Sequence, residues 1–440
     1  GGGEPREAGD RGGAYARRRE RGEIGGPVAE ARPPEGLYVH FPFCVSLCPY
    51  CDFVVVAGAA ARGPRSRTRA FVEALDVELA LRAEEVRSRF AVRSPLGSVY
   101  LGGGTPSLMH VAAVGSLLAT IDEQLGLAPE AEVTLEANPG ADEIGDLAGF
   151  RAAGVNRLSI GAQSLSDGEL RRLGRRHRAG DVATAVSAAR AAGFGSVSLD
   201  LLTDIPGQTL GSWQATLGGA LDLEPDHLSV YTLALDDPEA EGLTSPSGDH
   251  LPVSRGARAW RGRAMGEQSE ERAAEMELLT DELASAAGIA RYEIANLARP
   301  GQESRHNLLY WRRRPYLALG PGAHASDGAL TRTWNAARLD GYLRALAQGR
   351  LPPGGSETID EATATAERAI LGLRLREGIE ASLAAGPALA TGLAWAREQG
   401  LAEDTVGRTR LTQRGRLLAN EVFARLLPSE PAAAGPENEA

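Results

Sequence analysis

The sequence predicts an α/β protein: a partial (β/α)6-type TIM barrel followed by a small C-terminal helical domain of winged-helix type. Three observations lead to this fold class. Short apolar or β-branched runs recur along the first half of the chain, each ends in a polar or Gly-rich turn, and helical spacing of apolar residues follows. The alternation is typical of parallel strands joined by helices. Six such units suit an open barrel better than a complete eight-stranded one.

The predicted strands share a run of apolar residues that stops at a turn. They are LYVHF (37–41), SVYLGGG (98–104), EVTLEANP (132–139), NRLSIGAQ (156–163), SVSLDLL (196–202) and HLSVYTLAL (227–235). Helices are predicted between them, for example over Arg69–Arg89, where apolar residues recur at helical spacing, and over the Ala-rich Asp181–Ala192, which ends at Gly193.

The domain limits follow from shifts in composition. We expect the barrel at 36–330, with an insertion at 237–270 that is rich in Pro, Gly, Ser and Arg, and then a helix (Ser269–Ala286) and a strand (Ala290–Ala295). The C-terminal helical domain is expected at 331–428, with a two-stranded wing around Gly407. Residues 1–35 and 429–440 contain few bulky apolar residues and are predicted to be disordered tails.

The composition of the chain argues against nucleic acid as a partner and against a membrane-spanning segment. The 440 residues are 43% hydrophobic and carry a formal net charge of −11, which lacks the basic footprint of a nucleic-acid binder. The sequence contains no apolar run of 18 or more residues and no apolar signal region before residue 35. We therefore expect a cytoplasmic protein with no nucleic-acid partner and no transmembrane segment. Peripheral membrane contact stays open.

The cysteines carry the strongest chemical signal. Cys44, Cys48 and Cys51 are the only ones in the chain, and their C-x3-C-x2-C spacing directly follows the first predicted strand. A [4Fe–4S] cluster normally takes four thiolates, so three leave one iron open for an exchangeable ligand. The alternatives are a zinc site completed by His40 and thiols that are merely buried. A position at the carboxyl end of a barrel strand favours the cluster.

Polar residues recur at the same ends of later strands. Gly102, Gly103, Gly104 and Thr105 follow the second strand, where glycines allow close backbone approach and consecutive N–H groups can bind a carboxylate. Further candidates are Glu136, Gln163 and Asp200, which end the next three strands, and Arg175 on an intervening helix. Glu136, Gln163 or Asp200 alone could be only a cap for the next helix, and Arg175 is one of several neighbouring arginines. Their recurrence at one end of the barrel predicts a ligand site.

The cysteine motif in this context is similar to the radical-SAM superfamily. The resemblance implies a [4Fe–4S] cluster whose open iron chelates the amino and carboxylate groups of S-adenosylmethionine. It also implies reductive cleavage of that cofactor to a 5′-deoxyadenosyl radical.

Further motifs narrow the resemblance to one family. They are YVHFPFCVSLCPYCDF (38–53), GGGTPS, TLEANP, RLSIGAQS, LGRRH, DLLTDIPGQT and RHNLLYW (305–311). In this order they resemble the oxygen-independent coproporphyrinogen III oxidase family, and within it the heme chaperone (HemW) branch. The resemblance spans about residues 36–427.

The resemblance implies a residue set for both cofactors. Cys44, Cys48 and Cys51 would be the cluster ligands. The residues placed around S-adenosylmethionine are Tyr38, Tyr50, Gly103, Gly104, Thr105, Glu136, Gln163, Arg175, Asp200 and Ala234. Tyr38, Tyr50 and Ala234 rest on the resemblance alone, and Arg175 mostly so.

Two features favour the chaperone branch. Phe53 stands where the oxidases of the family carry a fourth cysteine, and HNLLYW resembles the HNxxYW motif of the heme chaperones. The resemblance thus implies a protein that binds heme and transfers it to an unidentified acceptor protein, with coproporphyrinogen oxidation as the alternative. His306 is a candidate heme ligand, although a histidine among aromatic residues also suits ordinary packing. Thr203 and Asp204 depart from the family pattern, which has an aromatic residue and a glycine there.

Overall fold

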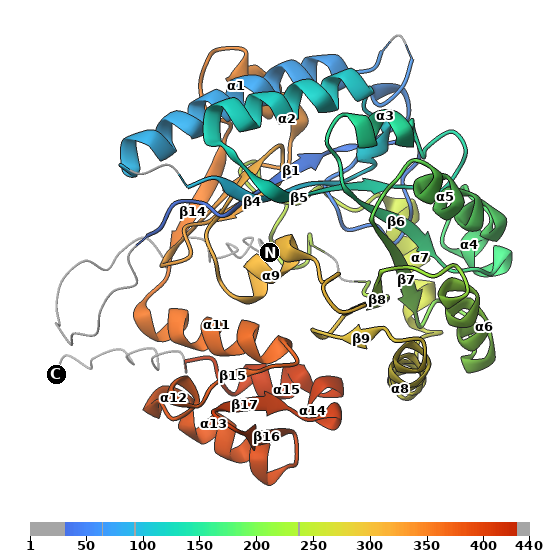
Figure 1. The fold of residues 1–440 in the computed structure, drawn as a ribbon, viewed down its shortest axis with the longest axis vertical. Coiled ribbons are helices and arrows are strands. Elements are labelled where there is room, and N and C mark those ends of the chain that lie inside the picture. The colour runs from blue at the N-terminus through green and yellow to red at the C-terminus, as the bar shows by residue number, and fades with distance from the viewer. Residues whose placement is uncertain (1–30, 64, 92–93, 236–237, 429–440) are drawn as a thin grey trace, which may run out of the picture.

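The computed structural model describes residues 31–63, 65–91, 94–235 and 238–428 (Figure 1). Most of the predicted N-terminal tail and all of the predicted C-terminal tail lie outside the described residues. Glu35, at the end of the predicted N-terminal tail, is part of the fold. The backbone N–H of Glu35 donates to the Pro315 carbonyl at 2.9 Å, and its carboxylate pairs with Arg314. Among the described residues, no helix has the length and apolar character needed to cross a membrane.

The six predicted strands are present, parallel and adjacent in chain order. They are β1 (Gly36–Phe41), β4 (Leu96–Gly103), β5 (Leu127–Ala137), β6 (Arg157–Gln163), β7 (Ser196–Thr203) and β8 (His227–Thr232). A seventh parallel strand, β11 (Tyr316–Leu319), pairs with the free side of β1. The inward and outward alternation of each strand explains why buried Leu37, Val39 and Phe41 recur at every second position.

Antiparallel strands extend this sheet at both edges. Beyond β8 lie β10 (Asn296–Ala298) and β9 (Ala290–Arg291), and beyond β11 lie β12 (His324–Ser326), β13 (Thr331–Asn335) and β14 (Gly354–Thr358). The edge strands β14 and β9 are not paired with each other in the described sheet. The fold is therefore an open, partial barrel, as predicted.

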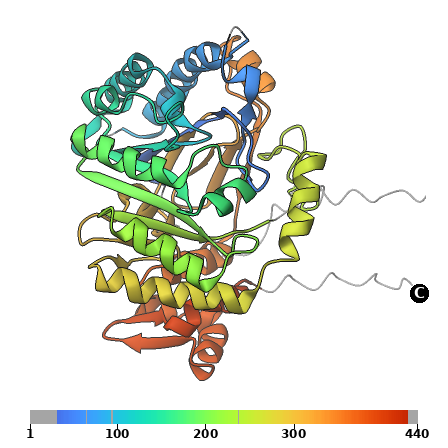
Figure 2. The same cartoon turned by 90° about the vertical axis from the view of Figure 1, so that its right-hand side faces the viewer.

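Helices cover the outer face of the sheet (Figures 1 and 2). They are α1 (Thr68–Arg89), α2 (Val111–Leu125), α3 (Leu147–Ala152), α4 (Asp167–Arg172), α5 (Ala179–Ala191), α6 (Leu210–Leu221), α8 (Glu270–Ala286) and α10 (Leu339–Leu346). The predicted helix starting at Ser269 begins one residue later, because the Ser269 hydroxyl caps α8 by accepting from the Arg272 N–H. Trp213, Phe71 and Phe150 are fully buried between the helices and the sheet.

Short elements fill the connections near the barrel mouth and floor. They are β2 (Phe43–Cys44), β3 (Val56–Ala57), two 3-10 turns at Gly58–Ala60 and Pro106–Leu108, α7 (Arg255–Met265) and α9 (Arg305–Trp311). The predicted insertion thus contains one regular helix, α7, which stands beside the barrel in Figure 2.

The C-terminal domain has its own core. Its elements are α11 (Glu361–Arg374), β15 (Ile379–Glu380), α12 (Ala381–Ala384), α13 (Pro387–Glu398), β16 (Ala402–Thr405), β17 (Arg408–Leu411), α14 (Gln413–Leu417) and α15 (Ala419–Ala424). Leu389, Leu393 and Val422 are buried together there. The predicted wing is the β16–β17 hairpin, whose turn needs Gly407 at φ 74°.

The predicted start of this domain at residue 331 needs correction. Strands β13 and β14 belong to the large sheet, and the Tyr342 ring of α10 packs 5.9 Å from the Phe71 ring of α1. The barrel unit therefore continues to about residue 358. The sequence did not reveal β13 and β14, because edge strands of five residues carry little periodicity of their own.

Candidate cofactor site

A cavity of about 410 Å³ opens at the carboxyl ends of the parallel strands. Most of the predicted site residues line it: Cys44, Cys48, Cys51, Tyr50, Gly103, Gly104, Glu136, Gln163, Arg175, Asp200 and Ala234. Tyr38, Thr105 and His306 lie outside its wall. Residues that are far apart in sequence therefore meet at the carboxyl ends of the parallel strands, as the strand pattern predicts.

The cysteine loop leaves β1 and closes over the cavity. It begins at β2, which pairs in parallel with β3, and it tightens where the Cys51 N–H donates to the Cys48 carbonyl at 3.1 Å. The Cys44 thiol lies 3.2 Å from the Thr105 hydroxyl. Burial raises the pKa of Cys44 to about 11, against the opposing effect of Thr105, and that of Cys51 to about 12. Both thiols are therefore protonated at neutral pH in the metal-free protein.

Arg175 supplies positive charge next to the loop. Its guanidinium lies 3.9 Å from the Cys48 sulfur and donates to the Gly161 carbonyl at 2.7 Å. Burial disfavours its charged form, but Tyr50 and Cys48 outweigh that effect and raise the pKa of Arg175 above its usual range. Its buried Nε has no hydrogen-bond partner among the described residues. A fixed cation with an unused donor fits a thiolate-ligated cluster and an anionic cofactor group.

The turn after β4 forms the second wall. The Gly103 N–H donates to one Glu136 oxygen at 2.9 Å, and the Tyr100 hydroxyl donates to the other at 2.9 Å. A Cβ added at Gly104 would lie 2.6 Å from the Phe43 carbonyl oxygen, so only glycine fits there without a shift. Burial, with a further contribution from Asp200, raises the pKa of Glu136 to about 7.

Asp200 and Gln163 occupy the next strand ends. Asp200 accepts from the Ser159 hydroxyl at 3.0 Å, and its burial raises its pKa. Gln163 has φ 65°, a left-handed conformation that the bulge between β6 and β7 imposes at the end of β6. Together with Glu136 they offer carboxylate and amide groups suited to ammonium and ribose hydroxyls.

The zinc alternative has no support in this geometry. His40 is buried, its Nδ1 lies 2.9 Å from the Tyr38 hydroxyl and its Nε2 lies 2.8 Å from the Val54 carbonyl. Both ring nitrogens are thus engaged. In the described ranges, no three His, Cys, Asp or Glu side chains gather around one point as a single ion requires.

His306 is not placed as an accessible heme ligand. Its side chain is fully buried, with Nδ1 2.8 Å from the Ser98 hydroxyl and Nε2 2.8 Å from the Tyr310 hydroxyl. Burial lowers its pKa to about 3, so the imidazole is neutral. The HNLLYW helix α9 packs against β4, and the contacts of its histidine are those of the packing alternative.

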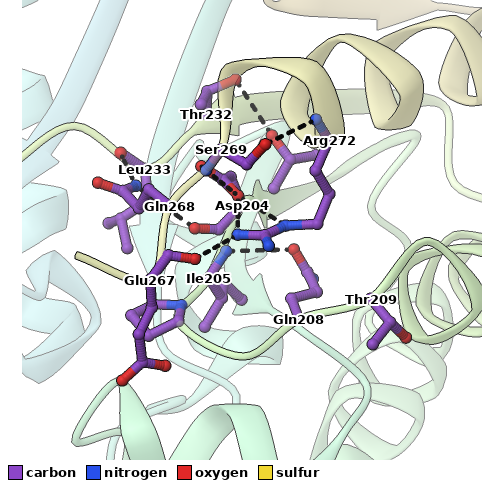
Figure 3. Close-up of polar contacts among 12 residues, drawn as sticks. Asp204, Ile205, Gln208, Thr209, Thr232, Leu233, Glu267, Gln268, Ser269 and Arg272 are labelled. Carbon is purple, nitrogen blue, oxygen red and sulfur yellow. Dashed lines mark hydrogen bonds and ion pairs between the residues drawn. The ribbon is translucent and has the colours of Figure 1, made fainter. Parts of the chain in front are cut away.

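The departure at Thr203 and Asp204 has a local explanation (Figure 3). Asp204 keeps a left-handed backbone, φ 55°, which aspartate tolerates better than most residues. Its carboxylate accepts from the Arg272 Nε at 2.9 Å and from the Ser269 N–H at 3.1 Å. Gln268 also donates to the Leu233 carbonyl at 2.7 Å. The substituted residue therefore anchors the α7–α8 connection to the end of β7.

Several cavity residues escaped the sequence reasoning. Arg157 and Ser159 on β6, Ser229 and Tyr231 on β8, and Asn307 on α9 all line the cavity. Arg157 is buried, and its Nε and Nη2 have no hydrogen-bond partner among the described residues. The alternation of inward-facing residues along β6 and β8 was the available signal for the strand residues.

The mouth of the cavity is apolar and exposed. Phe53 is 63% exposed and Leu47 is 49% exposed, and both line the cavity. Large apolar side chains left in solvent at the mouth of a pocket are typical of a binding surface. Phe53 thus presents an aromatic ring beside the cysteine loop.

Comparison with known families agrees with this geometry. The Radical SAM superfamily profile matches residues 38–218, and the HemN C-terminal domain profile matches residues 359–418. Fold and site together define a radical-SAM protein of the HemN-like type. The second match begins where the structure, rather than the sequence prediction, places the C-terminal domain.

The relatives narrow the family. The chain is 36% identical over 406 residues to the heme chaperone HemW of Mycobacterium tuberculosis, covering 92% of this chain and 98% of that protein. It is 32% identical over 406 residues to HemW of Bacillus subtilis, covering 89% and 98%. The chain therefore belongs to the HemW family. The solved structure of coproporphyrinogen III oxidase HemN from Escherichia coli shares the fold, with TM-score 0.72 at 22% identity over 90% of this chain and 91% of that chain.

Proposed function

We propose that this protein is a radical-SAM heme chaperone that binds heme and transfers it to an acceptor protein. Cys44, Cys48 and Cys51 would hold a [4Fe–4S] cluster, and S-adenosylmethionine would occupy the cavity beside it. When bound, these two groups supply one-electron reductive chemistry. The single observation that carries the proposal is the exposed Phe53, which stands two positions after Cys51, where an oxidase of the family has a fourth cysteine.

The cofactor part of the proposal rests on charge and donors. Arg175 would offset the negative charge of the cluster, and the Gly103–Gly104 backbone would approach the cofactor closely. Glu136, Gln163 and Asp200 would bind its ammonium and hydroxyl groups, with Tyr38, Tyr50, Thr105 and Ala234 completing the surroundings. Cys44 lies 3.2 Å from Thr105, so this hydroxyl would stabilise a bound thiolate.

The heme part rests on the cavity mouth and on the relatives. Phe53 and Leu47 offer an apolar surface to a flat macrocycle, and several relatives are named heme chaperone HemW. We also propose a cytoplasmic location, because reduced thiols are required to assemble the cluster. We propose that the acceptor of the heme is a second protein.

Heme titration tests the proposal. The full chain, reconstituted anaerobically with iron and sulfide, should bind heme stoichiometrically with a shifted Soret band. Cys48→Ala should lose the cluster signals. Absence of any Soret shift in the wild type would contradict heme binding.

A second assay tests the alternative. With reductant, S-adenosylmethionine and coproporphyrinogen III, the reconstituted protein should form no protoporphyrinogen. Product formation would establish the oxidase activity instead.

A further inference from the structure

The Arg157 guanidinium is buried in the cavity wall without a counter-charge. Arg157 is the first residue of β6, is 3% exposed, and lines the same cavity as the cysteine loop. Its Nε and Nη2 have no hydrogen-bond partner, and it forms no ion pair, among the described residues. Burying a charge without a counter-charge is costly, so buried ions in proteins are normally paired. A buried, unpaired cation that borders a cavity is suited to an anionic ligand.

The carboxyl groups on the neighbouring strands do not supply the missing charge. Asp200 accepts from the Ser159 hydroxyl with both oxygens, at 3.0 and 3.2 Å, and the two Glu136 oxygens accept from a backbone N–H and a hydroxyl of β4. Burial raises the pKa of both carboxyls although Arg157 opposes the shift, and the pKa of Glu136 reaches about 7. Burial thus weakens both groups as counter-charges, and neither forms an ion pair with Arg157.

Arg157 and Arg175 lie at different depths of the cavity. The Arg175 guanidinium lies beside Cys48 and donates to the Gly161 carbonyl at 2.7 Å. Gly161 follows Arg157 by four residues on β6, a separation of about 13 Å at the strand rise of about 3.3 Å per residue. S-adenosylmethionine carries one carboxylate, and Arg175 is the arginine next to the cysteine loop that would receive it. Arg157 is then left for a second anion, deeper in the barrel.

Uncharged polar groups line the cavity together with Arg157. Asn307 of α9 lines it, and the Asn307 side-chain amide forms no hydrogen bond with another described residue. His227 of β8 lines it too, but its ring nitrogens contact the Ser198 hydroxyl at 2.8 Å and the Tyr292 hydroxyl at 2.9 Å. Burial, with a contribution from Arg157, lowers the pKa of His227 well below its usual value, so this imidazole is neutral. Arg157 therefore supplies the positive charge, and Asn307 offers an unused amide donor.

We propose that Arg157 and Asn307 bind the carboxylate of a second organic ligand, deeper in the barrel than the S-adenosylmethionine site. Nε and Nη2, the two donors without a partner, form one edge of the guanidinium plane and can bind both oxygens of a carboxylate in parallel. The ligand is a carboxylic acid, either a free small molecule or the propionate chain of heme. This inference rests on the cofactor part of the proposed function, because it places S-adenosylmethionine beside the cysteine loop.

Propionate titration of the reconstituted full chain, loaded with S-adenosylmethionine, tests the site by saturation-transfer nuclear magnetic resonance. Wild type should bind propionate and not propionamide, which has the same shape without the charge. Arg157→Met should weaken propionate binding at least tenfold. Arg157→Lys keeps the charge but loses the two-donor edge, so it should weaken binding less. Equal binding of propionate to wild type and Arg157→Met, or no binding to wild type, would overturn the proposal.

Melting temperatures separate ligand binding from a structural role of Arg157. Without propionate, Arg157→Met should melt at or above the wild-type temperature, because it removes an unpaired buried charge. The matched control Arg190→Met removes a guanidinium that pairs with Asp226 at 2.7 Å, so it should lower the melting temperature and leave propionate binding unchanged. A fall for Arg157→Met as large as for Arg190→Met would make Arg157 a structural residue and overturn the proposal.

A comparison of heme with its dimethyl ester identifies the source of the carboxylate. If wild type binds heme more tightly than the ester, and Arg157→Met removes this preference, the site takes a heme propionate. If heme and ester bind alike while propionate binds, the site takes a free small carboxylic acid. Both results support the carboxylate site. A wild type that binds propionate but no heme contradicts the proposed heme function and leaves this inference standing.

Discussion

Removing the Arg261 guanidinium should loosen the cysteine loop. Arg261 on α7 is 4% exposed, and it donates to the carbonyls of Pro49 at 3.2 Å, Tyr50 at 3.3 Å and Cys51 at 2.9 Å. Its ion pair with Asp52 is longer, at 3.5 Å. One side chain from the insertion thus binds three consecutive carbonyls of the loop that carries the thiols. We expect Arg261→Met, which keeps the aliphatic stem, to disturb cluster retention more than the barrel.

The magnitude follows from those bonds. A hydrogen bond from a charged donor contributes about 1.5–3 kcal/mol, so three give a gross loss of about 5–9 kcal/mol. Water can reach the partly exposed loop and replace much of this, and the guanidinium itself no longer needs to be desolvated. We therefore expect a net local destabilisation of about 2–3 kcal/mol.

The rate at which the cluster loses iron measures this destabilisation of the cysteine loop. The reconstituted variant should release iron to a chelator roughly 30- to 150-fold faster than wild type, if release proceeds through loop opening, because 1.4 kcal/mol corresponds to a factor of ten. Arg263→Met, an exposed position on the same helix, is the matched control and should release iron at the wild-type rate. Equal release rates for Arg261→Met and wild type would refute the assigned role of Arg261.

Three further predictions concern separate parts of the molecule. Gly104→Ala should lower the free energy of unfolding of the apoprotein in urea by about 1–3 kcal/mol, because the added Cβ would meet the Phe43 carbonyl. The control Gly180→Ala should cause no such loss, because open space surrounds Gly180. An equal loss of stability in the two variants would contradict the steric argument. Affinity for S-adenosylmethionine should fall as the pH drops through about 7, where Glu136 gains its proton, and Glu136→Gln should flatten that profile. An affinity that does not change with pH in titration calorimetry would contradict this prediction. The raised pKa also means that the stability contributed by Glu136 declines as pH rises from 4.5 through 7, which urea unfolding of the apoprotein at several pH values would measure. Arg374→Ala should lower the melting temperature, because the Arg374 guanidinium lies 4.2 Å from the centre of the Trp311 ring and joins α11 to α9. Arg350 is exposed, so Arg350→Ala serves as the control. An equal fall in melting temperature for both variants would argue against a stabilising role of the Arg374–Trp311 contact.

The barrel was predictable because its signal is local. Each parallel strand is a short apolar run closed by a turn. Gly103, Glu136 and Asp200 stand near the carboxyl ends of their strands, and these ends meet at one face because parallel strands share a direction. The edge strands were not predictable in this way. β13 and β14 are short and partly exposed, and missing them moved the expected domain boundary.

Long-range contacts explain what the site reasoning missed. The motif made His306 a candidate ligand, but its side chain is buried, and one of its two hydrogen-bond partners, Ser98, lies 208 residues away on β4. The other partner, Tyr310, is four residues further along the same helix. Arg261 belongs to a segment without a motif. Its role depends on carbonyls near residue 50, to which no local pattern connects it. Asp204 departs from the family pattern, and only its contacts with Ser269 and Arg272 show why it is tolerated.

Electron paramagnetic resonance of the reduced, reconstituted protein tests the central claim most directly, because three thiols leave one iron free for S-adenosylmethionine. We predict a [4Fe–4S]⁺ signal whose g values shift when S-adenosylmethionine is added, and no such cluster in Cys48→Ala. A signal that is unchanged by S-adenosylmethionine, or that persists in Cys48→Ala, would contradict the account.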